Sequence, residues 1–206
     1  MTDQLHVAII DSDQAVLDSL RLYFSDHQFV VTSYSDAKEF LAALNRIEQL
    51  DCVICDIRIP VMSGIDLLDK LKQLGYDWPI ILMSANANVP MAVAAIKKGA
   101  FDFIDEPLDA SHLLESVRAA VSARKQSATL LSELEQLRSR FAALSSRQRE
   151  VMELVVAGLS NKEIALRLKI SPKTVDHHRA WVMERMGAHN LPELVRQAMR
   201  LHGHLT

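Results

Sequence analysis

The chain has 206 residues, 49% of them hydrophobic, which is enough for two small domains with packed cores. No run of about 18 apolar residues occurs and no basic segment leads into an apolar one at the start, so we expect a soluble cytoplasmic protein without a membrane span or secretory signal. Residues 1–139 hold 12 Lys and Arg against 20 Asp and Glu, a balance of −8, whereas residues 140–206 hold 11 against 6, a balance of +5, as is typical of a regulatory domain joined to a nucleic-acid-binding domain.

Apolar or β-branched segments alternate with amphipathic ones over the first half of the chain. The predicted strands are residues 5–10, 28–33, 51–56, 79–84 and 101–104. The predicted helices are residues 14–26, a segment for which Ser35 and Asp36 both offer caps, residues 64–74, residues 90–98 ending at Gly99, and a segment capped by Asp109. Strands that are apolar throughout belong to parallel sheets covered on both faces. The alternation therefore predicts an α/β domain with a doubly wound, flavodoxin-like sheet of five strands.

The two cysteines, Cys52 and Cys55, form a C-x-x-C string inside the third predicted strand. A redox-active pair needs both thiols near a helix N-terminus. Strand side chains alternate between faces, so positions 52 and 55 point in opposite directions. We therefore expect two core cysteines rather than a dithiol.

Polar side chains stand where four of the predicted strands end. They are Asp11, Asp56, Ser84 and Glu106. Ligands of doubly wound sheets bind beyond the carboxyl ends of the strands. Carboxylates and a hydroxyl that converge there predict a phosphoryl or metal site.

The helical pattern that starts at Asp109 continues beyond the first domain. Apolar residues recur at intervals of three and four over about two heptads. They are Leu130, Leu134, Leu137, Phe141 and Leu144. This segment is either a coiled-coil linker that pairs two protomers or an amphipathic helix on its own domain. A capping box at Ser145 predicts a break, which gives domains of residues 1–122 and 144–206 joined by a helical linker of residues 123–143.

The C-terminal segment predicts an all-α domain of four short helices. Ser160 begins a capping box, and Ser171 followed by Pro172 begins the next helix. The core residues expected in that helix are Val175, Val182 and Met186. Two short helices joined by a tight turn, the second starting with polar and basic residues, predict a helix-turn-helix that places the second helix in the DNA major groove.

The block Asp56-Ile-Arg-Ile-Pro-Val-Met-Ser-Gly64 resembles the phosphoacceptor loop of response-regulator receiver domains. With the helix-turn-helix pattern, the whole chain resembles the FixJ/NarL-type response regulators, whose output domains are LuxR-type. The resemblance implies a two-component transcriptional regulator rather than an enzyme. Its implied partners are a sensor histidine kinase, double-stranded DNA, and a second copy of the chain on that DNA.

The resemblance also implies roles for the residues at the strand ends. Asp56 would be the phosphoacceptor, and it would hold Mg²⁺ together with Asp11 and the backbone carbonyl of Arg58. Ser84 and Phe103 would be the switch residues that respond to the phosphoryl group. The ion and a lysine neutralise the charge that gathers at such a site. The family often has a cis peptide at the position of Glu106-Pro107.

Two positions depart from the family's pattern. Ser12 replaces the second acidic residue after the first strand, so one metal ligand is missing, and Asp13 is the neighbouring substitute. Glu106 stands where the family has its lysine, which adds a negative charge beside the phosphoryl group. The alternative to control through Asp56 is therefore a phosphorylation-independent DNA binder gated by a protein partner or ligand.

A more remote alternative is a haloacid-dehalogenase-like phosphatase. Its Asp-x-Asp signature is matched by Asp11 and Asp13, but Ala15 stands where that signature usually ends in Thr or Val.

By the resemblance, four residues of the second helix of the motif would lie nearest the base edges: Lys173, Asp176, His177 and Ala180. Four others would meet phosphates or the packing of the domain itself: Lys162, Thr174, His178 and Arg179. Lys and His can donate hydrogen bonds to guanine, and an aspartate can accept one from cytosine. Phosphate contacts set affinity and its dependence on salt, whereas base contacts set sequence preference.

Overall fold

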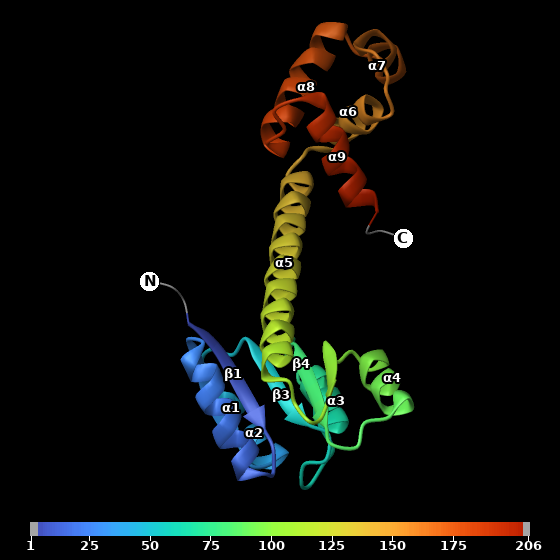
Figure 1. Ribbon diagram of the computed structural model, residues 1–206. Helices are drawn as coiled ribbons and strands as arrows, with labels where there is room; N and C mark the ends of the chain where they lie inside the picture. The colour runs from blue at the N-terminus through green and yellow to red at the C-terminus, as the bar shows by residue number, and fades with distance from the viewer. Residues whose placement is uncertain (1–3, 204–206) are drawn as a thin grey trace. The chain divides into compact units, whose positions relative to one another are not determined.

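The computed structural model describes residues 4–203, apart from the side chain of His202. The chain divides into two compact units between Gln126 and Ser127. Both units are drawn in Figure 1.

The first unit is an α/β domain, as predicted. Its five strands are β1 (Leu5–Ile10), β2 (Phe29–Tyr34), β3 (Cys52–Asp56), β4 (Ile80–Ser84) and β5 (Asp102–Asp105). Its helices are α1 (Gln14–Asp26), α2 (Ala37–Ala43) with the short turn η1 (Leu44–Arg46), α3 (Gly64–Gln73), α4 (Val89–Lys97) and the start of α5 (Ala110–Ala142). All strand pairs are parallel, in the order β2-β1-β3-β4-β5. The doubly wound five-stranded fold is confirmed.

The sheet separates two hydrophobic cores. One core packs α1 and α5 on one face through residues such as Phe24 and Val117, and it contains Cys52. The other packs α2, α3 and α4 on the opposite face, and it contains Cys55. The two thiols are free and fully buried, and burial raises the pKa of each. The prediction of two core cysteines on opposite faces is confirmed.

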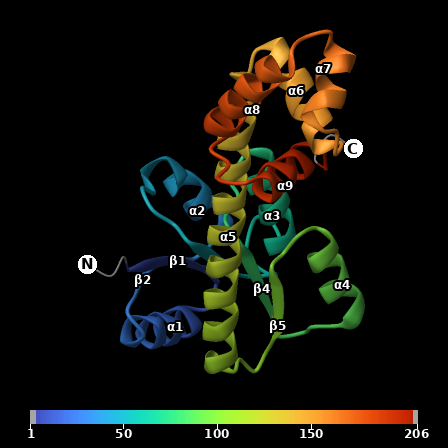
Figure 2. The ribbon, with the colours of Figure 1, turned by 90° about the horizontal axis from the view of Figure 1, so that it is seen from above.

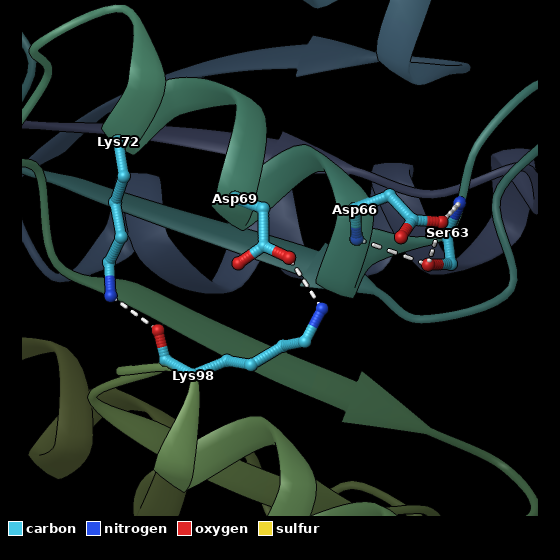
Figure 3. Close-up of polar contacts among 5 residues, drawn as sticks. All are labelled: Ser63, Asp66, Asp69, Lys72 and Lys98. Atoms are coloured by element: carbon cyan, nitrogen blue, oxygen red, sulfur yellow. Dashed lines mark hydrogen bonds and ion pairs between the residues drawn. The ribbon is translucent and has the colours of Figure 1, made fainter.

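Polar contacts cap α3 and join it to the C-terminal end of α4 (Figure 3). Ser63 caps α3 by accepting a hydrogen bond from the backbone N–H of Asp66, whose side chain reaches back to Ser63. Lys98, which follows α4, forms an ion pair with Asp69 of α3. Lys72 of α3 donates a hydrogen bond to the backbone carbonyl oxygen of Lys98. Helix α4 buries only one residue, so these contacts at its C-terminal end supplement a small apolar interface.

The second unit is helical and contains the end of α5 with α6 (Ser146–Val156), α7 (Asn161–Leu168), α8 (Pro172–Met186) and α9 (Leu191–His202), seen from above in Figure 2. The predicted caps at Ser145, Ser160 and Ser171 are present. The predicted core of α8, namely Val175, Val182 and Met186, is fully buried.

The end of α5 and the residues that follow it lie on the second unit's own core. Leu137 and Leu144 are buried among residues of α6, α8 and α9, and Phe141 packs against the same cluster. Glu133 also pairs with Arg200 of α9 at 3.0 Å. The apolar stripe had two interpretations. Packing on the chain's own domain holds for Leu137, Phe141 and Leu144, whereas Leu130 is exposed.

None of the helices within residues 4–203 combines the length and apolar character that crossing a membrane requires.

Candidate functional site

The polar residues predicted at the strand ends lie together at the carboxyl edge of the sheet. Asp11 follows β1, Asp56 ends β3, Ser84 ends β4, and Glu106 follows β5. Backbone hydrogen bonds hold this edge, because the N–H of Ile57 donates to Met83 at 2.9 Å and that of Glu106 donates to Ser84 at 3.0 Å. The Glu106-Pro107 peptide is cis, as the resemblance implied.

Asp11 is only 4% exposed. Its Oδ1 accepts a hydrogen bond from the backbone N–H of Asp13 at 2.8 Å. Burial raises the pKa of Asp11; the hydrogen bond from Asp13 opposes this, and the negative charges of Asp56 and Asp13 add to it. Asp11 is therefore a carboxylate under electrostatic strain, which a nearby positive charge would relieve.

Glu106 is half-buried at the same edge. Burial raises its pKa, and the charges of Asp56 and Asp11 raise it further, while Arg58 acts in the opposite direction. Glu106 therefore belongs to the same electrostatic cluster as the two aspartates. The glutamate at the position where the family has a lysine gives this edge of the sheet a third carboxylate.

Two of the predicted metal ligands fit a Mg²⁺ ion. Oδ1 of Asp56 is buried and has no hydrogen-bond partner among residues 4–203, and Asp11 supplies a second strained carboxylate. Mg²⁺ commonly binds through one or two carboxylates and keeps several waters. Asp13 is engaged elsewhere, because its Oδ1 caps α1 by accepting from Ala15 at 2.8 Å. Consistent with this, the described residues contain no cluster of three His, Cys, Asp or Glu arranged to hold a metal.

The two predicted switch residues lie on neighbouring strands. Ser84 is fully buried, and its Oγ accepts a hydrogen bond from the N–H of Asn86 at 3.3 Å. Phe103 is half-buried and pairs with Leu82 in the β4–β5 register.

Sequence reasoning missed two residues of this pocket. With the Asn86 amide turned so that both of its ends are satisfied, its oxygen accepts from Nη1 of Arg58 at 2.8 Å. A Cβ on Gly64 would lie 2.7 Å from the backbone oxygen of Asp56, so only glycine fits there. Gly64 had a signal, since it ends the motif block, whereas nothing in the sequence marks Asn86 as a partner of Arg58.

The second candidate site is the exposed side of α8. Lys173 and His177 are exposed on this helix, Ala180 is exposed one turn further, and Lys162 is exposed on α7. The side chain of Thr174 serves the cap instead, with its Oγ1 2.8 Å from Oγ of Ser171.

Other predicted residues of α8 are tied to α7. The side-chain amide of Asn161, the first residue of α7, donates to Asp176. Its oxygen accepts from Nη1 of Arg179 at 2.6 Å. His178 is half-buried, and its Nδ1 is buried with no hydrogen-bond partner in the described part of the chain. Asp176 and Arg179 thus hold α8 against α7, and Asp176 keeps an exposed position next to His177 in the sequence.

Comparisons with known proteins show the family of each unit. Residues 7–118 match the family "Response regulator receiver domain", and residues 142–198 match "Bacterial regulatory proteins, luxR family". The chain is 40% identical over 200 residues to the transcriptional regulatory protein FixJ of Bradyrhizobium diazoefficiens, covering 97% of each chain. It is 38% identical to the response regulator protein TodT of Pseudomonas putida, covering 98% of this chain and 88% of TodT.

Solved structures give the same result. The structure of the response regulator StyR has a TM-score of 0.79 at 32% identity, with 96% of this chain and 100% of that chain covered. Full-length FixJ from B. japonicum has a TM-score of 0.63 at 40% identity, with 98% and 99% covered.

Proposed function

The chain belongs to the two-component response regulators that join a receiver domain to a LuxR-type DNA-binding domain, and from this premise we propose that its receiver is not controlled by ordinary phosphorylation of Asp56. The membership predicted from the motifs is confirmed. The observation that carries the proposal is Glu106, whose pKa is raised by burial and by the charges of Asp56 and Asp11.

A phosphoryl group on Asp56 would bring more negative charge into this cluster. Two like charges about 5 Å apart repel by on the order of 3 kcal/mol at the effective dielectric of a protein surface. A lysine at position 106 would attract the phosphoryl group. The glutamate found there acts twice, because it removes that cation and adds an anion. Arg58 is the opposing charge, and its contact with Asn86 holds it at the β4–α4 side of the pocket.

Kinase-driven phosphorylation of Asp56 is the second candidate, and one observation favours it. Oδ1 of Asp56 is buried without a partner, which suits an oxygen that meets Mg²⁺ or a phosphoryl donor. Asp11, Asp56 and the carbonyl of Arg58 would hold Mg²⁺, which supplies charge neutralisation when bound. Ser84 and Phe103 would then be the switch residues. Treatment with acetyl phosphate and Mg²⁺ separates the candidates, because only the second leads to a phosphoryl group on Asp56.

For the output unit we propose that α8 reads DNA sequence. Lys173 and His177, exposed on the same side of α8, would donate to base edges, with Asp176 beside them. Lys162 of α7 would bind a phosphate, whereas Thr174, His178 and Arg179 would set the position of α8 through their own contacts. Selection of binding sequences from a randomised duplex pool tests this, and a selection that enriches no sequence would contradict it.

The proposal includes a homodimer on DNA, a sensor histidine kinase or another protein as the input partner, and a location in the cytoplasm. Exposed apolar residues at i, i+4 and i+7 of α4, namely Val89, Val93 and Ile96, support self-association. Sedimentation of the chain with and without duplex DNA measures the dimer.

We infer no catalytic turnover by the chain, and hydrolysis of a generic phosphate ester would contradict this and favour the phosphatase alternative.

A further inference from the structure

We propose that Trp181 of α8 makes an apolar contact with a thymine methyl group in the major groove and so gives the protein a preference for thymine at one position of each half-site. The inference rests on the proposed function, because it requires α8 to enter the groove.

Trp181 lies on the side of α8 that carries the proposed base contacts. It follows His177 by four residues and Lys173 by eight, which turns it about 40° and 80° from them around the helix axis. Side chains of a helix lean towards its N-terminus, so the indole covers the preceding turn. In agreement, its ring centroid is 6.5 Å from that of His177 and 5.7 Å from that of His178. The indole is therefore placed over the half of the helix that reads bases.

Trp181 is not part of the core of its own unit. Half of it, 50%, is exposed, whereas the core residues Val175 and Val182 of the same helix are buried. A large aromatic side chain that touches only two histidine rings of its own helix and stays half exposed gains apolar burial from a second surface. Its position beside His177, in a segment of balance +5, favours DNA as that surface.

Thymine is the base that fits this contact. In the major groove it is distinguished by its C5-methyl group, which proteins read with apolar side chains. His177, which neighbours Trp181, and Lys173, two turns earlier in α8, offer hydrogen-bond donors to other bases, so Trp181 adds a kind of contact that they cannot supply. The result is a site in which donors and an apolar ring read adjacent base pairs.

The test compares the full-length wild type, Trp181→Ala and Leu166→Ala by selection from a randomised duplex pool. Leu166 on α7 is 83% exposed, so its removal controls for the loss of exposed apolar surface. We expect the wild type and Leu166→Ala to enrich the same sequence, and Trp181→Ala to lose one thymine preference per half-site. If the wild type enriches no sequence, the proposed function itself fails. If Trp181→Ala enriches the wild-type sequence with every thymine preference intact, only the present inference is wrong.

Replacing that thymine by deoxyuridine in the enriched duplex removes the methyl group alone. Wild-type binding should weaken about 4-fold, the factor that corresponds to roughly 0.8 kcal/mol for one buried methyl group, and Trp181→Ala should bind both duplexes equally. Equal wild-type affinity for the two duplexes would overturn the proposal.

A second measurement leaves Trp181 unchanged and so does not depend on how the variant folds. The chain has two tryptophans, and Trp78 lies in the first unit, stacked on Tyr76. In Trp78→Phe, the emission of Trp181 is observed alone. Saturation with the enriched duplex should reduce acrylamide quenching of this emission at least 2-fold, and unchanged quenching would contradict the contact.

Discussion

Glu106 shows how one side chain changes the chemistry of a shared pocket. Its pKa is raised by burial and by Asp56 and Asp11, so the folded chain binds more protons than the unfolded chain between the two pKa values of this group. Its contribution to stability is therefore largest below the unfolded pKa and is lost as the pH rises through the folded pKa. At neutral pH the ionised Glu106 destabilises the receiver.

We accordingly expect Glu106→Gln to stabilise the receiver at pH 7 to 8. The gain should be on the order of 0.5 kcal/mol, because the group is partly exposed, and should raise the Tm by about 2 °C. It should disappear as the pH falls to about 4, where the glutamate is protonated in the folded state. Thermal unfolding at several pH values measures this, with the exposed Glu115→Gln as the control. A gain of the same size at pH 4 and pH 8 would refute the explanation.

Lys173 allows the proposed base contacts to be tested against phosphate contacts. It is exposed at the second position of α8, where recognition helices meet base edges. Lys173→Ala should weaken binding to the selected duplex about 10-fold to 100-fold, with a smaller effect on random DNA. Lys162→Ala is the comparison, because loss of a phosphate contact weakens both alike. Equal losses for Lys173→Ala on both duplexes would make Lys173 a phosphate contact.

At the scale of elements, Ser171 determines where the recognition helix begins. Its Oγ accepts from the backbone N–H of Thr174 at 3.1 Å and lies 2.8 Å from the hydroxyl of that residue. Ser171→Ala should cost about 1 kcal/mol and lower the Tm of the second unit, whereas Ser171→Asp, which keeps an acceptor, should cost less. Thermal unfolding followed by circular dichroism gives both values. Equal destabilisation by the two substitutions would mean that the cap is not the cause.

The elements themselves could be predicted because their signals are local. Apolar strands, caps such as Asp36 and Ser160, and glycine stops each involve neighbouring residues, and the observed boundaries lie within a residue or two of those expected. The apolar stripe of α5 left two interpretations open, because periodicity shows that a face is apolar but not what covers it. The partners of Leu137 and Phe141 became known only from the packed unit.

The candidate sites were predictable to a smaller extent. Motif spacing identified Asp56, Ser84 and the polar side of α8. It did not identify the contacts of Asn161 with Asp176 and Arg179, which join residues 15 and 18 positions apart. Such pairs depend on how two helices cross, which the sequence of either helix does not specify.

At the scale of the whole molecule, the charge is divided between the two units. Residues 127–206 carry 12 Lys and Arg against 8 Asp and Glu, a balance of +4, while the chain as a whole is at −3. Since non-specific affinity follows phosphate neutralisation, the fragment of residues 127–206 should bind random duplex DNA several-fold more tightly than the full chain at low salt. The difference should shrink as salt screens the acidic receiver. Fluorescence anisotropy measures both affinities, and equal values at low salt would argue against this electrostatic effect.

If Glu106 prevents ordinary phosphorylation of Asp56, the intact mass of the protein after treatment with acetyl phosphate and Mg²⁺ will show it. We predict no mass gain for the wild type and a gain of one phosphoryl group for Glu106→Lys, which should vanish when Asp56→Asn is added. A phosphoryl group on the wild type that Asp56→Asn abolishes would contradict the claim and establish Asp56 as a working phosphoacceptor.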